Sequence, residues 1–297
     1  MDGLDRRVDG LDGLSERWRA DLAGWGIPPE IAAKAPADPW AHSPARFAER
    51  TARALADPEG PTLARIAEAL PQDGRVLDVG AGTGAASLPL AAAAGTPVPP
   101  AGTGDCGAPP AGAGSLGELV AVDTSEGMLA ELASRAAALG VPTRVIRGRW
   151  PDVAGQAPVA DVAVAAHVVY NVPDLVPFLT GLTAHARRRV VLELPYRHPM
   201  SWLNPLWAHF HGVVRPQRPT ADDVAAIAEA LGYDVRRTER LAPLSRFADM
   251  DALAESACRR LCLDPGRAQE VVAAVTALDM WPVPRERWIT LWWEPAS

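Results

Sequence analysis

The chain contains 297 residues, of which 48% are hydrophobic and 22% are charged, and its formal net charge is −7. This composition is ordinary for a soluble globular protein, and the length suits one large domain or a domain with a cap. Phosphate binding relies on clustered Lys and Arg, so the acidic balance argues against a nucleic-acid surface. The sequence shows neither a signal-peptide core nor an apolar span long enough for a membrane helix. We therefore expect a cytoplasmic protein that binds no nucleic acid and no membrane.

The first part of the chain, residues 1–72, carries helical patterns and no strand pattern. Apolar residues recur at helical spacing over residues 14–25. Ser43 followed by Pro44 is a typical helix start, and this helix is expected to run to about residue 56. Another helix is predicted over residues 63–70. We expect this segment to form a helical cap or lid.

The pattern changes at residue 75 into apolar strands that alternate with helices. Such an alternation predicts a parallel sheet covered by helices on both faces, with right-handed crossovers. The predicted strands cover residues 76–79, 119–122, 144–146, 159–165, 190–194 and 287–293, and the predicted helices cover residues 85–94, 126–139, 175–187 and, after the N-cap Thr220, 221–231.

The segment 73–297 is therefore predicted to be one α/β domain, which is interrupted in three places. Residues 96–117 hold six Gly and five Pro, which predicts a flexible surface loop. Residues 197–219 and 245–284 are predicted helical insertions that contribute to the cap. The second insertion carries two helices, at about residues 250–261 and 266–278. These helices precede the last strand and interrupt what would otherwise be a hairpin.

A glycine-rich turn follows the first strand, in the sequence Asp78-Val79-Gly80-Ala81-Gly82-Thr83-Gly84. Glycines at alternate positions let the backbone turn tightly and approach a ligand closely. A strand, a glycine turn and a helix N-terminus together indicate a nucleotide-binding corner. The turn also satisfies the G-x-G-x-x-A pattern of dinucleotide folds, although such a match is weak by itself. The next strand ends at Asp123, which suits a ribose diol in either type of site.

The two motifs together, Asp78 to Gly84 and Ala121-Val122-Asp123-Thr124-Ser125 with Met128-Leu129, resemble those of the class I S-adenosylmethionine-dependent methyltransferases. The resemblance covers about residues 74 to 195. It implies a Rossmann-like sheet of seven strands, mostly parallel, whose last strand is antiparallel. It also implies S-adenosyl-L-methionine as cofactor, S-adenosyl-L-homocysteine as product, and no metal.

By this resemblance, Asp78 and the turn residues Gly80, Ala81, Gly82 and Gly84 hold the methionine moiety and its approach to the ribose. Asp123, followed by Thr124, binds the ribose hydroxyls, and Met128 packs against the adenine. His167, after the fourth strand, is expected to form a wall of the same cofactor site.

The sequence departs from the family pattern in two respects. Asp123 follows Asp78 by 45 residues, where about 20 is usual, and the Gly/Pro-rich loop accounts for the excess. Arg149 stands where the family often has an acid for the adenine amine. Adenine recognition then falls to backbone groups, to Asp152 or to stacking by Trp150, and a packing role for Trp150 is equally open.

Groups on the acceptor side are expected after the fourth and fifth strands. Tyr170 is a candidate to line the acceptor cavity, and His198 is the best candidate for acid–base chemistry, although packing or helix capping explains each as well. Tyr196, Trp202 and Trp207 are candidate substrate contacts, and the helical spacing around the two tryptophans also fits a core. Ten Trp against three Tyr and four Phe favour an aromatic or apolar small acceptor.

The sequence thus predicts a methyltransferase that acts on a small apolar or aromatic molecule by in-line transfer. Two alternatives remain open: an NAD(P)-dependent oxidoreductase, and a non-catalytic S-adenosylmethionine-binding module. Cys258 and Cys262 lie four residues apart without a neighbouring His or Cys, so we expect them to pack rather than to bind a metal. The sequence does not decide whether O, N or C is methylated, or whether the protein is a monomer or a homodimer.

Overall fold

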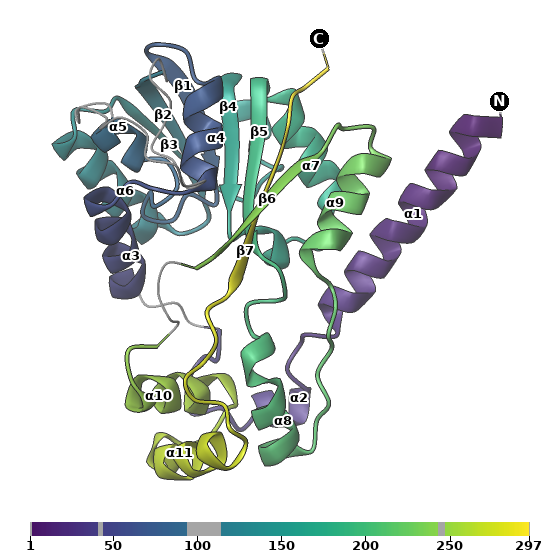
Figure 1. Cartoon of the computed structure of the whole chain (residues 1–297), viewed down its shortest axis with the longest axis vertical. Helices are drawn as coiled ribbons and strands as arrows, with labels where there is room; N and C mark the ends of the chain where they lie inside the picture. The colour runs from purple at the N-terminus through teal and green to yellow at the C-terminus, as the bar shows by residue number, and fades with distance from the viewer. Residues whose placement is uncertain (1, 41–43, 94–113, 243–246, 297) are drawn as a thin grey trace, which may run out of the picture.

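The computed structural model describes residues 2–40, 44–93, 114–242 and 247–296, with side chains from residue 10 onward except those of residues 44–46 and 93. Within these residues, seven strands form one sheet in the order β3-β2-β1-β4-β5-β7-β6 (Figure 1). Strands β1 to β5 are parallel, whereas β7 is antiparallel to both β5 and β6. The predicted Rossmann-like α/β fold is confirmed. The strands are β1 (Gly74–Val79), β2 (Leu116–Asp123), β3 (Thr143–Arg147), β4 (Ala160–Ala166), β5 (Ala186–Pro195), β6 (Arg236–Leu241) and β7 (Arg287–Trp293).

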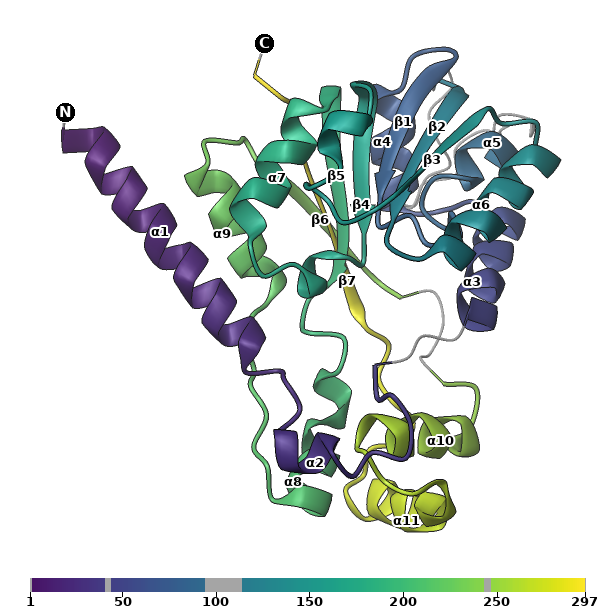
Figure 2. The same cartoon turned by 180° about the vertical axis from the view of Figure 1, so that it is seen from behind.

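Helices cover both faces of the sheet (Figures 1 and 2). Successive side chains of a strand point to opposite faces, so Val76 joins one apolar cluster and Leu77 the other. The cluster around Val76 also includes Ile66 and Leu132, whereas the cluster around Leu77 includes Trp18. One face therefore carries α4 (Pro61–Ala69), α5 (Pro89–Ala93) and α6 (Glu126–Ala138), and the other carries α1 (Asp2–Ala23), α7 (Leu175–Ala184) and α9 (Ala221–Ala230).

Local signals in the sequence set where several helices begin. Ser125 precedes α6, and its hydroxyl accepts a hydrogen bond from the Met128 N–H at 3.4 Å. Thr220 and Asp223 form a capping box at the start of α9. Proline at the first position opens α4. These caps fix the turns that follow the strand ends.

A separate group of helices forms a cap beyond the carboxyl ends of the parallel strands, toward which the arrowhead of β4 points (Figure 1). It has its own apolar cluster, which includes Leu206, Leu253 and Val271. The cap consists of α2 (Pro29–Ala32), α8 (Asn204–His211), α10 (Met250–Arg260) and α11 (Ala268–Ala277). Open α/β sheets bind ligands at this edge, so the cap adjoins the expected site.

The N-terminal segment, expected to form one cap or lid, is spread over the molecule. Helix α2 joins the cap, whereas α1 packs against α9, and α4 packs against β5. Helix α3 (Pro44–Ala56) lies beside α5 and α6, near the glycine turn. Helices α2 and α3 adjoin the ligand-binding edge, and α4 reaches it at its first turn, through Thr62.

Several elements differ from the prediction: α1 begins at Asp2 rather than near residue 14, and β5 begins at Ala186 rather than at residue 190. The helix expected over residues 85–94 is reduced to α5, because Pro89 has no N–H to bond to a preceding carbonyl. Helix α7 ends at Ala184 rather than near residue 187, since β5 already begins at Ala186. Strand β6 had no predicted bounds. Most of the predicted loop at 96–117 lies outside the described residues, and residues 116–117 begin β2. In the described part of the chain, no helix has the length and hydropathy needed to cross a membrane.

Candidate active site

The glycine turn leaves β1 at the middle of the sheet. Gly80 and Gly82 have φ angles of +70° and +53°, which glycine adopts without strain. A Cβ on Gly80 would lie 2.3 Å from Cγ2 of Val168, whereas a Cβ on Gly82 would meet its nearest atom, in Phe47, only at 3.6 Å. The N–H groups of Gly80 and Ala81 both donate to the Val122 carbonyl, at 2.8 and 3.1 Å. The turn is thus held rigidly between β2 and the segment after β4.

Asp78 lies beneath this turn and is 1% exposed. Its Oδ2 atom has no hydrogen-bond partner within the described residues. Burial raises the pKa of Asp78 to about 7; the Ser87 hydroxyl opposes the rise, and the nearby charge of Asp123 adds to it. A cation or hydrogen-bond donor beside Oδ2 would satisfy this oxygen and restore the charged form. The buried carboxylate therefore fits an ammonium-bearing ligand.

Asp123 closes β2 and adjoins the same turn. Its Oδ2 accepts the Gly82 N–H at 2.9 Å, and its Oδ1 accepts the Ser125 N–H at 2.8 Å. The residue is half-buried, and each carboxylate oxygen has a further lone pair for a ligand hydroxyl. The next residue, Thr124, is exposed, whereas Met128 is buried in the first turn of α6. These positions agree with a ribose diol beside Asp123.

Of the side chains expected to bind adenine, one is buried and two are exposed. Trp150 is buried, its indole N–H donates to the Phe178 carbonyl at 3.3 Å, and its ring packs edge-on against His185. This environment favours the packing role for Trp150. Arg149 and Asp152 are both exposed, so they remain available to a ligand.

Helix α3 covers the glycine turn, which no local sequence pattern indicated. The hydroxyls of Thr51 and Thr83 are 2.7 Å apart and fully enclosed, and Phe47 lies against Gly82. Arg50 lies about one helical turn after Phe47, and its guanidinium approaches Glu193 of β5. The helix thus connects the cofactor side of the site to the acceptor side.

Glu193, from strand β5, is the centre of a polar cluster on the acceptor side. It is 5% exposed, and one of its oxygens accepts the Thr62 hydroxyl at 2.6 Å. Its other oxygen lies 2.9 Å from Nε2 of His167. Nitrogens of Arg240 and Arg50 approach the carboxylate at 3.4 and 3.7 Å. Four elements far apart in the sequence therefore meet at one buried acid.

The charges of this cluster set the protonation of His167. Burial and the positive charge of Arg50 lower the pKa of His167 to about 4, although Glu193 opposes the shift. The pKa of Glu193 lies well below its usual range: burial alone would raise it, but His167 and the two arginines lower it by more. His167 is also held in a left-handed conformation, with φ of +59°, and its N–H donates to the Glu193 carbonyl at 2.6 Å. The imidazole is therefore neutral and fixed at neutral pH.

Trp288, at the start of β7, provides the ring over which the guanidinium groups of Arg50 and Arg240 lie. The guanidinium carbons of Arg50 and Arg240 lie 5.2 and 5.1 Å from the centre of the Trp288 indole. His167 meets the same ring edge-on at 4.6 Å. Sequence reasoning missed Arg50, Arg240 and Trp288, and the one available signal was the acid Glu193 within the otherwise apolar run 190–194.

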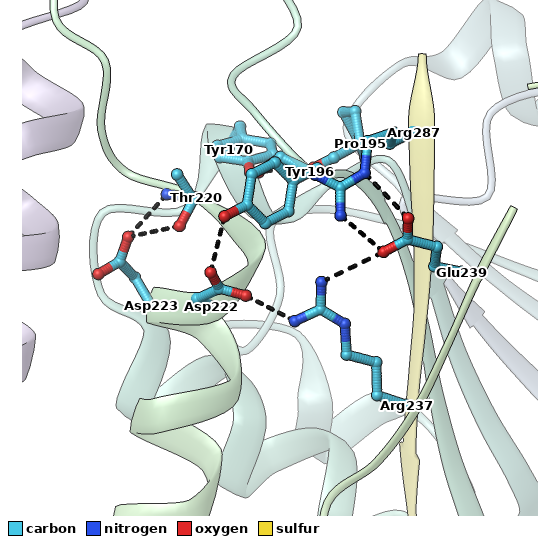
Figure 3. Close-up of polar contacts among 9 residues, drawn as sticks. All are labelled: Tyr170, Pro195, Tyr196, Thr220, Asp222, Asp223, Arg237, Glu239 and Arg287. Carbon is cyan, nitrogen blue, oxygen red and sulfur yellow. Dashed lines mark hydrogen bonds and ion pairs between the residues drawn. The ribbon is translucent and has the colours of Figure 1, made fainter. Parts of the chain in front are cut away.

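Tyr196, a predicted substrate contact, belongs to a surface network of ion pairs (Figure 3). Its hydroxyl donates to Asp222 at 2.8 Å, and the Arg287 guanidinium lies 4.3 Å from its ring centre. Asp222 pairs with Arg237, and Arg287 pairs with Glu239 through two nitrogens (Figure 3). The network gives Tyr196 a structural role between α9 and the antiparallel strands β6 and β7.

The two predicted catalytic residues, Tyr170 and His198, are in contact with each other. Their rings pack edge-on at 5.4 Å, and His198 also stacks on Trp25 at 4.0 Å. The Tyr170 hydroxyl donates to the carbonyls of Pro195 and Tyr196, at 3.0 and 3.1 Å, and burial raises its pKa far above the usual range. Both residues thus have close packing partners, and their catalytic roles stay predictions.

The remaining predicted residues belong to the cap. Trp207 is 3% exposed, and Trp202 packs edge-on against Phe247, within the apolar cluster of the cap. Cys258 and Cys262 are buried there as free thiols. The described residues contain no group of His, Cys, Asp and Glu that is arranged to hold a metal ion. The helical stripe around Trp202 and Trp207 therefore serves the core of the cap.

Comparisons with known proteins bear on this site. A family model for a methyltransferase domain matches residues 47–238. A cyclopropane-fatty-acyl-phospholipid synthase-like protein from Lactobacillus casei has a similar structure, with a TM-score of 0.52, 17% identity, and coverage of 89% of this chain and 97% of that chain. The YcgJ protein from Bacillus subtilis has a TM-score of 0.51, 15% identity, and coverage of 83% and 99%. A magnesium protoporphyrin IX methyltransferase from Synechocystis, solved with bound S-adenosylhomocysteine, has a TM-score of 0.45, 17% identity, and coverage of 85% and 83%.

No curated protein sequence matches the chain. At these identities the solved structures show the fold, whereas the family model spans well over half of the chain and includes the glycine turn, Asp123 and Glu193. The cofactor is S-adenosyl-L-methionine, in agreement with the motifs and with the buried oxygen of Asp78. The chain belongs to the class I S-adenosylmethionine-dependent methyltransferase family.

Proposed function

We propose that this protein transfers a methyl group from S-adenosylmethionine to a small molecule bound between α3, the cap and the carboxyl ends of β4 and β5. The observation that supports this most is the unpartnered Oδ2 of Asp78 beneath the glycine turn. A buried carboxylate oxygen without a partner is costly, and a ligand ammonium removes that cost.

Different residues around the glycine turn would bind different parts of the cofactor. Asp78 would hold the ammonium group, the backbone of Gly80, Ala81, Gly82 and Gly84 would line the methionine moiety, and Asp123 would hold the ribose hydroxyls. When bound, the cofactor supplies an activated methyl group on a sulfonium. The protein then has chiefly to align the acceptor with that methyl and to exclude water.

The acceptor would lie on the side of the Glu193 cluster. His167 follows the carboxyl end of β4, and Trp288 lies at the start of β7. The side chains of His167 and Glu193 are 17% and 7% exposed. An aromatic or otherwise planar small acceptor suits a site bounded by an indole and an imidazole. Tyr170 and His198, predicted from the sequence for proton transfer, remain candidates to be tested.

Calorimetry with S-adenosylmethionine, S-adenosylhomocysteine and NAD tests the cofactor directly. We expect the first two to bind and NAD to give no heat; binding of NAD alone would overturn the proposal. Incubation of the protein with a host metabolite extract and isotope-labelled S-adenosylmethionine, followed by mass spectrometry, tests methyl transfer. Cofactor binding without any labelled product would instead indicate the non-catalytic binding module.

A further inference from the structure

Two arginines from distant elements meet over one indole ring on the acceptor side. Arg50 comes from α3 and Arg240 from the end of β6, and their guanidinium carbons lie 5.2 and 5.1 Å from the centre of the Trp288 ring. Their side chains are 39% and 24% exposed. Both cations are therefore held in place and remain within reach of a solute.

These arginines share a single carboxylate, which has other partners. One nitrogen of each approaches Glu193, at 3.7 and 3.4 Å, and Glu193 also accepts the Thr62 hydroxyl and contacts His167. Short, two-nitrogen contacts are the strong form of an arginine–carboxylate pair, and neither arginine makes one here. The Nε atom of Arg240 is buried and has no hydrogen-bond partner among the described residues. The cluster thus keeps unused donors.

The groups around the Trp288 ring set the local charge that an incoming solute meets. His167 is neutral, because burial and the arginine charges lower its pKa. Glu286 is the other acid beside the ring, and its carboxylate accepts the Trp288 indole N–H at 3.2 Å. Two guanidiniums against Glu193 leave one positive charge within the cluster itself, and the carboxylate of Glu286 balances that charge from the indole N–H of Trp288. Besides burial, the charge of Arg50 disfavours a proton on His167, and the same charge favours an incoming anion.

We propose that Arg50 and Arg240 bind a carboxylate group of the methyl acceptor, so that the substrates of this enzyme are small organic acids. This proposal rests on the proposed function. A monoanion adds one negative charge beside Glu193 and Glu286, whereas a phosphate adds nearly two at neutral pH, so the carboxylate is the better match. The planar guanidinium fork also matches a carboxylate through two parallel hydrogen bonds. Arg50 reaches the site from the same helix that covers the glycine turn, so acid binding and cofactor binding would both order α3.

Calorimetry on protein saturated with S-adenosylhomocysteine tests the site, with benzoate, benzamide and inorganic phosphate as probes. We expect benzoate to bind and benzamide and phosphate to bind at least about tenfold more weakly, since hydrogen bonds between charged groups account for such a difference. Arg50→Met and Arg240→Met should each weaken benzoate about tenfold or more. Arg237→Met is the matched control, because Arg237 lies on β6 but pairs with Asp222 on the opposite face, and it should leave benzoate binding unchanged.

A second readout does not depend on activity or on the variants folding well. In wild-type protein, NMR titration of the His167 imidazole should show its pKa rising when benzoate is added and staying constant with benzamide. Equal binding of benzoate and benzamide, or preference for phosphate, would overturn the carboxylate assignment. Loss of S-adenosylhomocysteine binding in the same samples would instead contradict the proposed function, so the two failures are distinguishable.

Discussion

Nε2 of His167 lies 2.9 Å from the Glu193 carboxylate, and the backbone N–H of His167 donates to the Glu193 carbonyl as well. The ends of β4 and β5 are therefore joined twice, once through side chains and once through the main chain. The positive φ of His167 directs the following residue, Val168, onto Gly80. One histidine thus ties the acceptor cluster to the cofactor turn.

Replacement of Glu193 by Gln should destabilise the protein by about 2–3 kcal/mol. Removing one partner from a fully buried ion pair costs about 3–5 kcal/mol, and the partial exposure of Arg50 and Arg240 lowers that cost. Denaturant unfolding measures the change. Glu239→Gln is the control, because its exposed pair with Arg287 should account for less than about 1 kcal/mol. Equal losses in the two variants would show that Glu193 is not the centre of the cluster.

Asp78→Asn should stabilise the ligand-free protein at high pH and weaken its cofactor binding. The folded-state pKa of Asp78, about 7, lies above its ordinary value, so the folded protein binds more protons between about pH 4 and 7. Wild type therefore loses stability as pH rises through this window, by up to about 4 kcal/mol. His167, with its lowered pKa, changes stability in the opposite direction below about pH 6.5 and offsets part of this loss in wild type.

Unfolding free energies at pH 5 and pH 8, measured without ligand, test this effect. The gain in Asp78→Asn should be larger at pH 8 than at pH 5, and S-adenosylmethionine affinity should fall because the ligand ammonium loses its carboxylate. Asp234→Asn, at a side chain that is 87% exposed, should change neither quantity. A gain that does not depend on pH would contradict the raised pKa.

Gly80→Ala should destabilise the protein and abolish tight cofactor binding. The added Cβ would lie 2.3 Å from Val168 Cγ2 and would hold an alanine at φ of +70°, and overpacking with left-handed strain costs about 1–3 kcal/mol. Val168→Ala should recover part of the loss in the double variant, which a double-mutant cycle measures. Gly127→Ala in α6, where a Cβ meets no atom within 4 Å, should instead be neutral or stabilising.

The cofactor half of the site could be predicted from the sequence because its signals are local. The glycine turn follows β1 and Asp123 ends β2. Because these two strands are parallel, their carboxyl ends meet at the same edge of the sheet. The acceptor half could not be predicted, because Arg50, Glu193 and Arg240 meet only through tertiary packing. Their sequence separations give no periodic pattern to read.

The elements of the fold likewise differ in whether local sequence or tertiary packing determines them. Buried strands such as β1 have continuous apolar runs, whereas β6 lies at the sheet edge and alternates charged residues with partly buried ones. An edge strand with solvent on one face carries no apolar run, and β6 was therefore missed. Helix α1 was predicted, but its position against α9 depends on Trp18, whose indole N–H donates to the Val172 carbonyl.

Thr51→Val should loosen α3 from the glycine turn. The Thr51 and Thr83 hydroxyls form a fully enclosed hydrogen bond of 2.7 Å, and its loss leaves a buried hydroxyl unsatisfied at a cost of about 1–3 kcal/mol. Amide hydrogen exchange should become faster across residues 44–56. The control Thr276→Val removes an exposed hydroxyl bonded within α11 and should leave that exchange unchanged. Unaltered exchange in Thr51→Val would show that other contacts hold α3.

Tyr170→Phe and His198→Asn separate packing from catalysis for the two residues that the sequence predicted as catalytic. Tyr170 donates to two carbonyls, so its variant should lose about 1–2 kcal/mol of stability. General acid–base catalysis contributes about 100-fold or more, whereas a packing role should leave kcat per folded molecule within about tenfold of wild type. We expect the smaller effect for both variants, since burial holds the Tyr170 proton and His198 is stacked on Trp25. Tyr233→Phe is the control, because its ring stacks on Trp293, which pairs with Val190 of β5, away from the carboxyl ends of the parallel strands. A loss of about 100-fold or more in either variant, with stability retained, would instead assign that residue to proton transfer.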